Sequence, residues 1–194
     1  MRIRTRLGKR PAACLALLIA WAAAYAQQRE IDGSKSTMTV LVEKTGVFSA
    51  FGHNHEIVAP VAGRVDTGAR KVEVRVNAAA MKVRDTKGSE KDHAQIQATM
   101  LGPEVLDVKS YPEIVFRSTA AEQASGGSWT VKGELTLHGK TRPVTVQVKE
   151  SNGHFTGSSM LKQSEFGITP VKVAGGTVRV KDDVKIEFDI QLAR

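Results

Sequence analysis

The sequence predicts an all-β protein, because its apolar residues follow the period of strands rather than that of helices. Over residues 185–192 every even position is apolar and every odd position is charged or an amide. Such alternation is typical of a strand with one buried and one solvent-exposed face. The alternating segments are separated by short turns of glycine, asparagine and aspartate, and only one stretch has helical spacing.

About eight strands are predicted in this way. They cover residues 37–44, 56–66, 71–76, 113–120, 129–137, 144–149, 154–164 and 185–192. An antiparallel arrangement of such half-buried strands forms either a sandwich of two sheets or a closed barrel. The periodicity by itself does not distinguish these two architectures.

Residues 89–108 are expected to form a helical insert. Ser89 followed by Asp92 is typical of a capping box, in which the two side chains satisfy the first N–H groups of a helix. Apolar residues then recur at helical spacing as far as Leu101, and Pro103 prevents the helix from continuing. We expect this helix to cover one end or flank of the strands.

Residues 1–26 have the features of a signal peptide. Five basic residues precede an apolar run at 12–24, which is too short for a stable membrane span, and Ala24-Tyr25-Ala26 matches the small-x-small cleavage pattern. We therefore expect cleavage after Ala26, a periplasmic or secreted location, and a single domain over residues 27–194. Removing the leader lowers the net charge from +8 to +3, because it holds five of the 28 basic residues and none of the 20 acidic ones.

Composition and motifs argue against several classes of function. A net charge of +3 without a concentrated basic stripe does not favour nucleic-acid binding. The single cysteine, Cys14, lies in the leader, so disulfides and thiol chemistry are not expected in the domain. No Gly-x-Ser-x-Gly elbow is present, and we expect no enzymatic activity.

Three motifs in the second half of the chain carry a family resemblance. They are the run from Tyr111-Pro112 to Ser118, the glycine hairpin over residues 133–144, and Phe166-Gly167-Ile168. Their order and spacing resemble the YceI-like family, which are secreted bacterial proteins that fold as lipocalin-like β-barrels and hold a polyisoprenoid or similar lipid. The resemblance extends over residues 36–194.

The resemblance implies an eight-stranded antiparallel lipocalin-like barrel that sequesters or carries an amphiphilic lipid without reacting with it. A quinone or a polyprenyl chain is the implied ligand, no cofactor is expected besides this lipid, and delivery would involve transient contact with a membrane. Individually, Trp129 and Phe188 are expected in the core rather than stacked on a ligand. The expected lining residues are those that point inward on the strands with the clearest alternation: Ile114, Phe116, Val131, Leu135, Val144, Val146, Ile186, Phe188 and Ile190.

The pair His53 and His55 leaves two further hypotheses open. Residues i and i+2 of a strand share a face, so both imidazoles could bind one metal ion, with a third ligand from the helical insert such as His93. The other interpretation is that they hydrogen-bond the backbone or the headgroup of a ligand. The alternatives to lipid binding are thus a periplasmic metal-binding protein, and a structural or partner-binding barrel with a packed interior. The oligomeric state is not indicated by the sequence.

Overall fold

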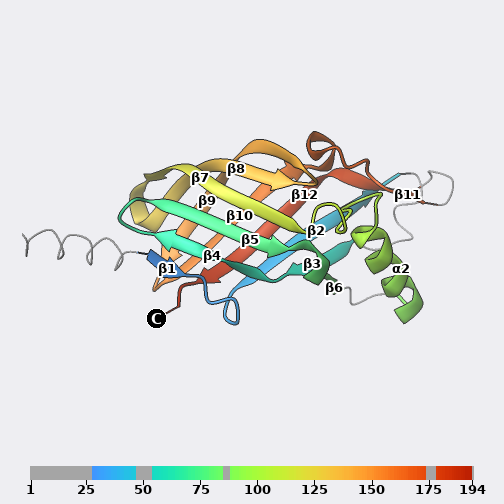
Figure 1. The fold of residues 1–194 in the computed structure, drawn as a ribbon, viewed down its shortest axis with the longest axis horizontal. Helices are drawn as coiled ribbons and strands as arrows, with labels where there is room; N and C mark the ends of the chain where they lie inside the picture. Colours follow the sequence, from blue (N-terminus) through green and yellow to red (C-terminus); the bar gives the residue numbers. More distant parts are fainter. Residues whose placement is uncertain (1–27, 47–53, 85–87, 174–177, 194) are drawn as a thin grey trace, which may run out of the picture.

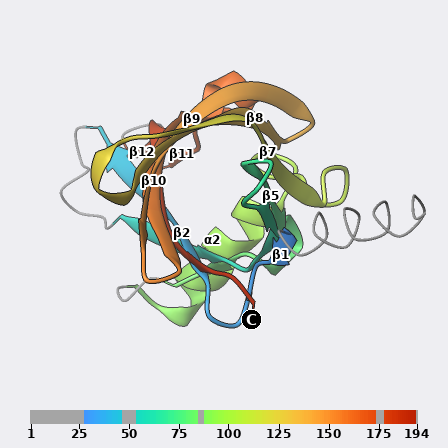
Figure 2. The same ribbon diagram turned by 90° about the vertical axis from the view of Figure 1, so that its left-hand side faces the viewer.

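A computed structural model describes residues 28–46, 54–84, 88–173 and 178–193, and it confirms the all-β class. All strands belong to one antiparallel sheet that curls around a central axis (Figures 1 and 2). The strands are β1 (Gln28–Glu30), β2 (Thr37–Thr45), β3 (His55–Ala59), β4 (Val61–Asp66), β5 (Lys71–Asn77), β6 (Lys82–Val83), β7 (Glu113–Gln123), β8 (Ser128–Leu137), β9 (Lys140–Ser151), β10 (His154–Lys162), β11 (Lys172–Val173) and β12 (Val178–Gln191). The helices are α2 (Glu90–Leu101) and the short 3₁₀ helices η2 (Ala78–Ala80), η3 (Ser125–Gly127) and η4 (Gln163–Phe166).

The sheet closes through a strand that changes partner at Pro60. β3 pairs with β2, whereas β4, which follows directly after Pro60, pairs with β5. Proline has no N–H to donate to a ladder, so it suits the position where the chain leaves one partner for the next. With β3 and β4 taken as one bent strand, the ring contains eight strands in the order β2, β3–β4, β5, β7, β8, β9, β10 and β12.

The strand count differs from the prediction for two reasons. The predicted strand 56–66 is divided in two at Pro60, and the short strands β1, β6 and β11 lie outside the eight-stranded ring. The described residues therefore form twelve strands. A second closure is made where β1 meets the end of β12: Ile31 bridges Leu192, and the Ala193 N–H donates to the Glu30 carbonyl over 2.8 Å.

Helix α2 begins with the predicted capping box. The Ser89 hydroxyl accepts from the Asp92 N–H over 3.2 Å, and the Asp92 carboxylate accepts from the Ser89 N–H over 3.1 Å. The Gln97 side chain ties the helix to the barrel, because it accepts from the Val83 N–H and donates to the Met81 carbonyl, each over 2.8 Å. These contacts place α2 beside β3 and β6 at one end of the barrel, which we call the helical end (Figure 1).

The opposite end of the barrel is formed by hairpin turns and by both ends of the described chain. β1 and the C-terminal residues lie there, together with the turn between β4 and β5 and the segment η3 between β7 and β8 (Figures 1 and 2). We call it the hairpin end. The Arg29 guanidinium donates to the Ala193 carbonyl over 2.8 Å, which ties the two chain segments together.

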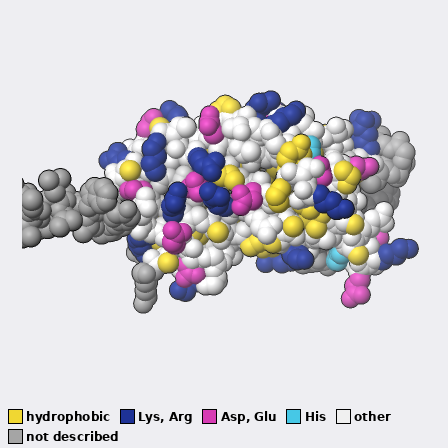
Figure 3. All heavy atoms as spheres, in the orientation of Figure 1, with side chains coloured by type: hydrophobic (Ala, Val, Ile, Leu, Met, Phe, Trp, Pro, Cys, Tyr) yellow, Lys and Arg dark blue, Asp and Glu magenta, His cyan; other side chains and the backbone are white. Residues whose placement is uncertain are grey.

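An ion-pair cluster on the outer face of β4, β5 and β7 is centred on Glu73. Its carboxylate accepts from Arg75 over 2.8 Å and from Arg117 over 3.0 Å, and Arg64 lies 4.0 Å away. Acidic and basic side chains are interspersed over this face of the barrel (Figure 3). The hydrogen bond from Arg75, followed by that from Arg117, holds the pKa of Glu73 below its ordinary value of 4.5.

Replacing Glu73 with glutamine should lower the thermal midpoint of unfolding at neutral pH, because three arginines lose their shared counter-charge. A carboxyl whose pKa is lower in the folded state stabilises the fold above its unfolded pKa, and this contribution disappears as the pH falls through the folded pKa. The difference between Glu73→Gln and wild type should therefore shrink in acid below the ordinary value of 4.5. Thermal melts followed by circular dichroism across this pH range provide the measurement.

Glu122→Gln is the matched control, because Glu122 is an exposed carboxylate with one lysine partner, Lys132, at 3.1 Å. Its effect should be smaller at neutral pH. Equal melting curves for wild type and Glu73→Gln at neutral pH would contradict the role assigned to the cluster.

Candidate functional site

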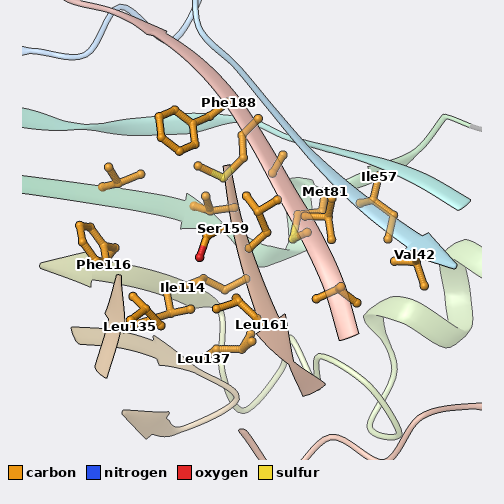
Figure 4. Close-up of a pocket in the computed structure, with 18 of the residues that line it drawn as sticks. Val42, Ile57, Met81, Ile114, Phe116, Leu135, Leu137, Ser159, Leu161 and Phe188 are labelled. Carbon is orange, nitrogen blue, oxygen red and sulfur yellow. The ribbon is translucent and has the colours of Figure 1, made fainter. Parts of the chain in front are cut away.

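The barrel encloses a cavity of about 710 Å³. Each strand of the eight-stranded ring contributes inward apolar side chains to its wall, and the size lies in the range typical of small-molecule pockets. Figure 4 shows these side chains converging from opposite sides of the ring, with Ile57 and Val42 near the helical end and Phe116 and Phe188 farther along. The site is therefore an apolar lumen and not a surface cleft.

The predicted lining residues on the clearly alternating strands all face this cavity. They are Ile114, Phe116, Val131, Leu135, Val144, Val146, Ile186, Phe188 and Ile190. His55 lies on the cavity wall as well, at the start of β3, whereas His53 lies outside the described residues. That these side chains contact a ligand stays a prediction.

Several cavity residues were not singled out in the sequence. Valines of β2 and β5, among them Val40, Val42 and Val74, line the wall and follow the same alternation, so the signal was present. Met100 and Leu106, from the helical insert, also reach the cavity. Trp129 lines the lumen too, where the sequence predicted a core position. Periodicity identifies an inward side chain, but it does not show whether that side chain meets other side chains or empty space.

Two glycines make room for two of the aromatic rings of the wall. A Cβ atom on Gly133 of β8 would come within 2.5 Å of the Phe116 ring, and one on Gly157 of β10 within 2.6 Å of the Phe188 ring. Each ring therefore occupies the space that a side chain on the neighbouring strand would take. As a consequence the two phenylalanines form part of the wall without filling the lumen.

Polar groups at the cavity are concentrated toward its two ends. At the helical end the wall includes Lys44, His55 and Arg179, together with Asp92 and Gln95. At the hairpin end a smaller polar set comes from the last residue of β4, Asp66, and from Thr67 and Arg70 in the turn that follows it. The lumen is apolar along its length, apart from Ser159 in the middle of β10, and polar at its ends, which suits a ligand with a long apolar chain.

Of the three histidines considered as metal ligands, the structure describes two. His93 lies half-buried on α2 and His55 on the cavity wall, while His53 is not described. Within the described ranges, no group of three or more histidine, cysteine, aspartate and glutamate side chains is arranged to hold a metal ion. The set of His53, His55 and His93 stays a hypothesis.

None of the helices in the described part of the chain is long and apolar enough to cross a bilayer.

Comparison with protein families gives a match to the YceI-like domain over residues 30–192, which includes every strand of the ring. The chain belongs to the YceI-like family. The resemblance of the three sequence motifs is thereby confirmed, and the family match also covers the N-terminal strands, where the motifs were absent.

Individual relatives agree with this assignment. A UPF0312 protein of Pseudomonas putida (strain W619) is 34% identical over 108 residues, which are 50% of this chain and 54% of that protein. A UPF0312 protein of Vibrio cholerae is 26% identical over 113 residues, 53% of this chain and 58% of its own. The chain thus spans about half the length of the curated relatives it matches.

The same barrel occurs in a solved structure. The crystal structure of BcnA from Burkholderia cenocepacia matches 84% of this chain and 99% of BcnA, with a TM-score of 0.64 and 22% sequence identity. At this level of identity the similarity concerns the fold. The predicted lipocalin-like barrel class is confirmed.

Replacing Gly133 with alanine should destabilise the barrel, because the new Cβ would lie 2.5 Å from both the Arg117 carbonyl oxygen and the Phe116 ring. Overpacking of this kind typically costs about 1–3 kcal/mol. Denaturant titration of wild type and Gly133→Ala measures the difference. The double variant Gly133→Ala with Phe116→Leu should recover part of the loss, since the smaller side chain removes one of the two clashes. A Gly133→Ala protein as stable as wild type would show that the position of the Phe116 side chain does not depend on this glycine.

Proposed function

We propose that this protein is an exported binding protein that holds an amphiphilic lipid inside the barrel, with a polyisoprenoid such as a quinone or a polyprenyl chain as the ligand type. The observation that supports it is the lumen itself: about 710 Å³ bordered by apolar side chains from the entire ring. Membership in the YceI-like family supports a lipid-binding role at the level of the family.

The energetic basis of binding is the burial of hydrocarbon. Moving apolar surface out of water contributes about 25 cal/mol per Å², so a long chain that fills the lumen gains affinity along its whole length. The wall is built mainly from valine, isoleucine and leucine, and two of its three phenylalanines, Phe116 and Phe188, lie against glycines. A slender chain fits such a space. No reaction at the ligand is part of this proposal.

The orientation of the ligand follows from the distribution of polar groups. The helical end offers the larger polar set, with Lys44 and Arg179 as basic groups and with His55 and Gln95 as hydrogen-bonding groups. We place the headgroup there and the apolar chain in the lumen. His55 thus has the role of a headgroup contact in this proposal, which is the second of the two interpretations of the histidine pair.

Substituting Val146 with tryptophan tests whether the lumen binds the lipid. Val146 points inward from the middle of β9, opposite Val131 of β8, so an indole ring there would occupy the space of the chain. Lipid extracted from Val146→Trp purified from its native host should fall at least tenfold relative to wild type, which corresponds to ~1.4 kcal/mol of lost affinity. Far-ultraviolet circular dichroism should remain that of a β-protein.

Thr145→Trp is the matched control, because Thr145 is the neighbouring residue on β9 and is exposed on the outer face. It should retain the lipid content of wild type. If wild-type protein from the native host carries no lipid and Val146→Trp unfolds, the barrel has a packed interior that serves a structural or partner-binding role. Stoichiometric zinc or copper that disappears in the His53→Ala, His55→Ala double variant would instead favour the metal-binding alternative.

Export is the second part of the proposal, and it rests on the basic residues, apolar run and Ala24-Tyr25-Ala26 pattern of the leader. N-terminal sequencing of protein recovered from the periplasm or medium should begin at Gln27. Replacing both Ala24 and Ala26 with glutamine should block cleavage, because the peptidase reads small residues at these positions. Recovery of the wild-type chain with Met1 still attached would contradict export by this route.

A further inference from the structure

Trp129 occupies a position where the cavity meets the hairpin end. It is the second residue of β8 and points inward, on the same face of the strand as Val131 and Leu135. Its directly opposed partners are Gln123, the last residue of β7, and Val148 of β9. The side chain lines the lumen and is still partly exposed to solvent, so the indole ring lies between the cavity and the outside.

The indole ring of Trp129 is also in contact with Arg70, which belongs to a different hairpin. The Arg70 guanidinium carbon lies 5.8 Å from the centre of the Trp129 ring, which is the geometry of a cation–π contact. Arg70 belongs to the turn between β4 and β5, whereas Trp129 follows the turn between β7 and β8, and β5 and β7 lie between the two outer strands. The contact therefore joins two neighbouring hairpins at the hairpin end of the barrel.

We propose that Trp129, held by Arg70, is the end stop of the lumen and sets the longest apolar chain that the barrel encloses completely. This inference rests on the proposed lipid-binding function and adds the residue that determines chain-length selectivity. A chain with its headgroup at the helical end runs toward the hairpin end, where the indole ring blocks its path.

The physical consequence is a break in the dependence of affinity on chain length. As long as an added methylene enters the lumen, affinity rises about fourfold, which corresponds to ~0.8 kcal/mol per buried methylene. Once the chain reaches Trp129, further methylenes stay in water or force the chain to fold back, and affinity stops rising. The break marks the distance from the headgroup site to the indole ring.

The indole N–H of Trp129 makes phenylalanine a suitable matched substitution. Nε1 is buried, and no acceptor among the described residues pairs with it. A ring without this donor therefore loses no hydrogen bond, and removing an unsatisfied buried donor carries no penalty of its own. Trp129→Phe keeps an aromatic ring at the stop, while Trp129→Ala opens the space.

The experiment uses delipidated wild-type protein, Trp129→Phe and Trp129→Ala, with prenyl alcohols of increasing length from farnesol to solanesol. Their affinities are measured by displacement of diphenylhexatriene. Wild type and Trp129→Phe should show a break at a similar length, and Trp129→Ala should bind the longer alcohols at least fourfold more tightly than wild type while binding the shortest about equally. If Trp129→Ala does not fold in a thermal melt, Trp129→Leu takes its place with the same expected direction.

Two results separate the inference from the function on which it rests. If the wild-type protein binds diphenylhexatriene but no prenyl alcohol displaces it, the proposed ligand class is wrong. If the alcohols bind and the break occurs at the same length in wild type and Trp129→Ala, Trp129 is not the end stop. A change that affects only the rate of displacement in Trp129→Ala, with unchanged length dependence, also overturns the inference, because it would make the ring a gate.

Discussion

Closure of the sheet at Pro60 is the constraint on which the lumen depends. An open sheet of this length would leave two edges of unpaired N–H and C=O groups, and it would have no enclosed interior. The chain avoids this because one bent strand pairs with β2 on one side of Pro60 and with β5 on the other. The bridge between Ile31 and Leu192 closes the ring a second time at the hairpin end.

A closed ring of eight strands is narrow, so the size of the inward side chains decides whether the interior is a packed core or can hold a ligand. Aliphatic side chains of medium size cover the wall without meeting at the axis. Phe116 and Phe188 would fill much of this space if they pointed toward the axis, but each lies over a glycine of a neighbouring strand. The same two Phe–Gly pairs therefore pack the wall of the barrel and leave the lumen open.

Sequence periodicity was sufficient for the strands, for the capped helix and for the direction of the lining residues, because each of these is a local property of the chain. Pro60 shows the limit: its segment reads as one strand, and no local pattern reveals that the strand has different partners on its two sides. Strands β1, β6 and β11, of two or three residues, are too short to show a period. Trp129 was expected in the core for a related reason, since alternation reports which way a side chain points and not what it meets there.

The junction of Arg29 with Ala193 places both ends of the described chain at the hairpin end, remote from α2 (Figure 1). This arrangement determines how the protein would be oriented when it is attached to a surface. A surface linker joined at Gln28 or at Ala193 would attach the barrel by its hairpin end, with the helical end directed away from the support. Protein immobilised in this way would present the helical end, with its polar groups, to the surrounding solution from either attachment point.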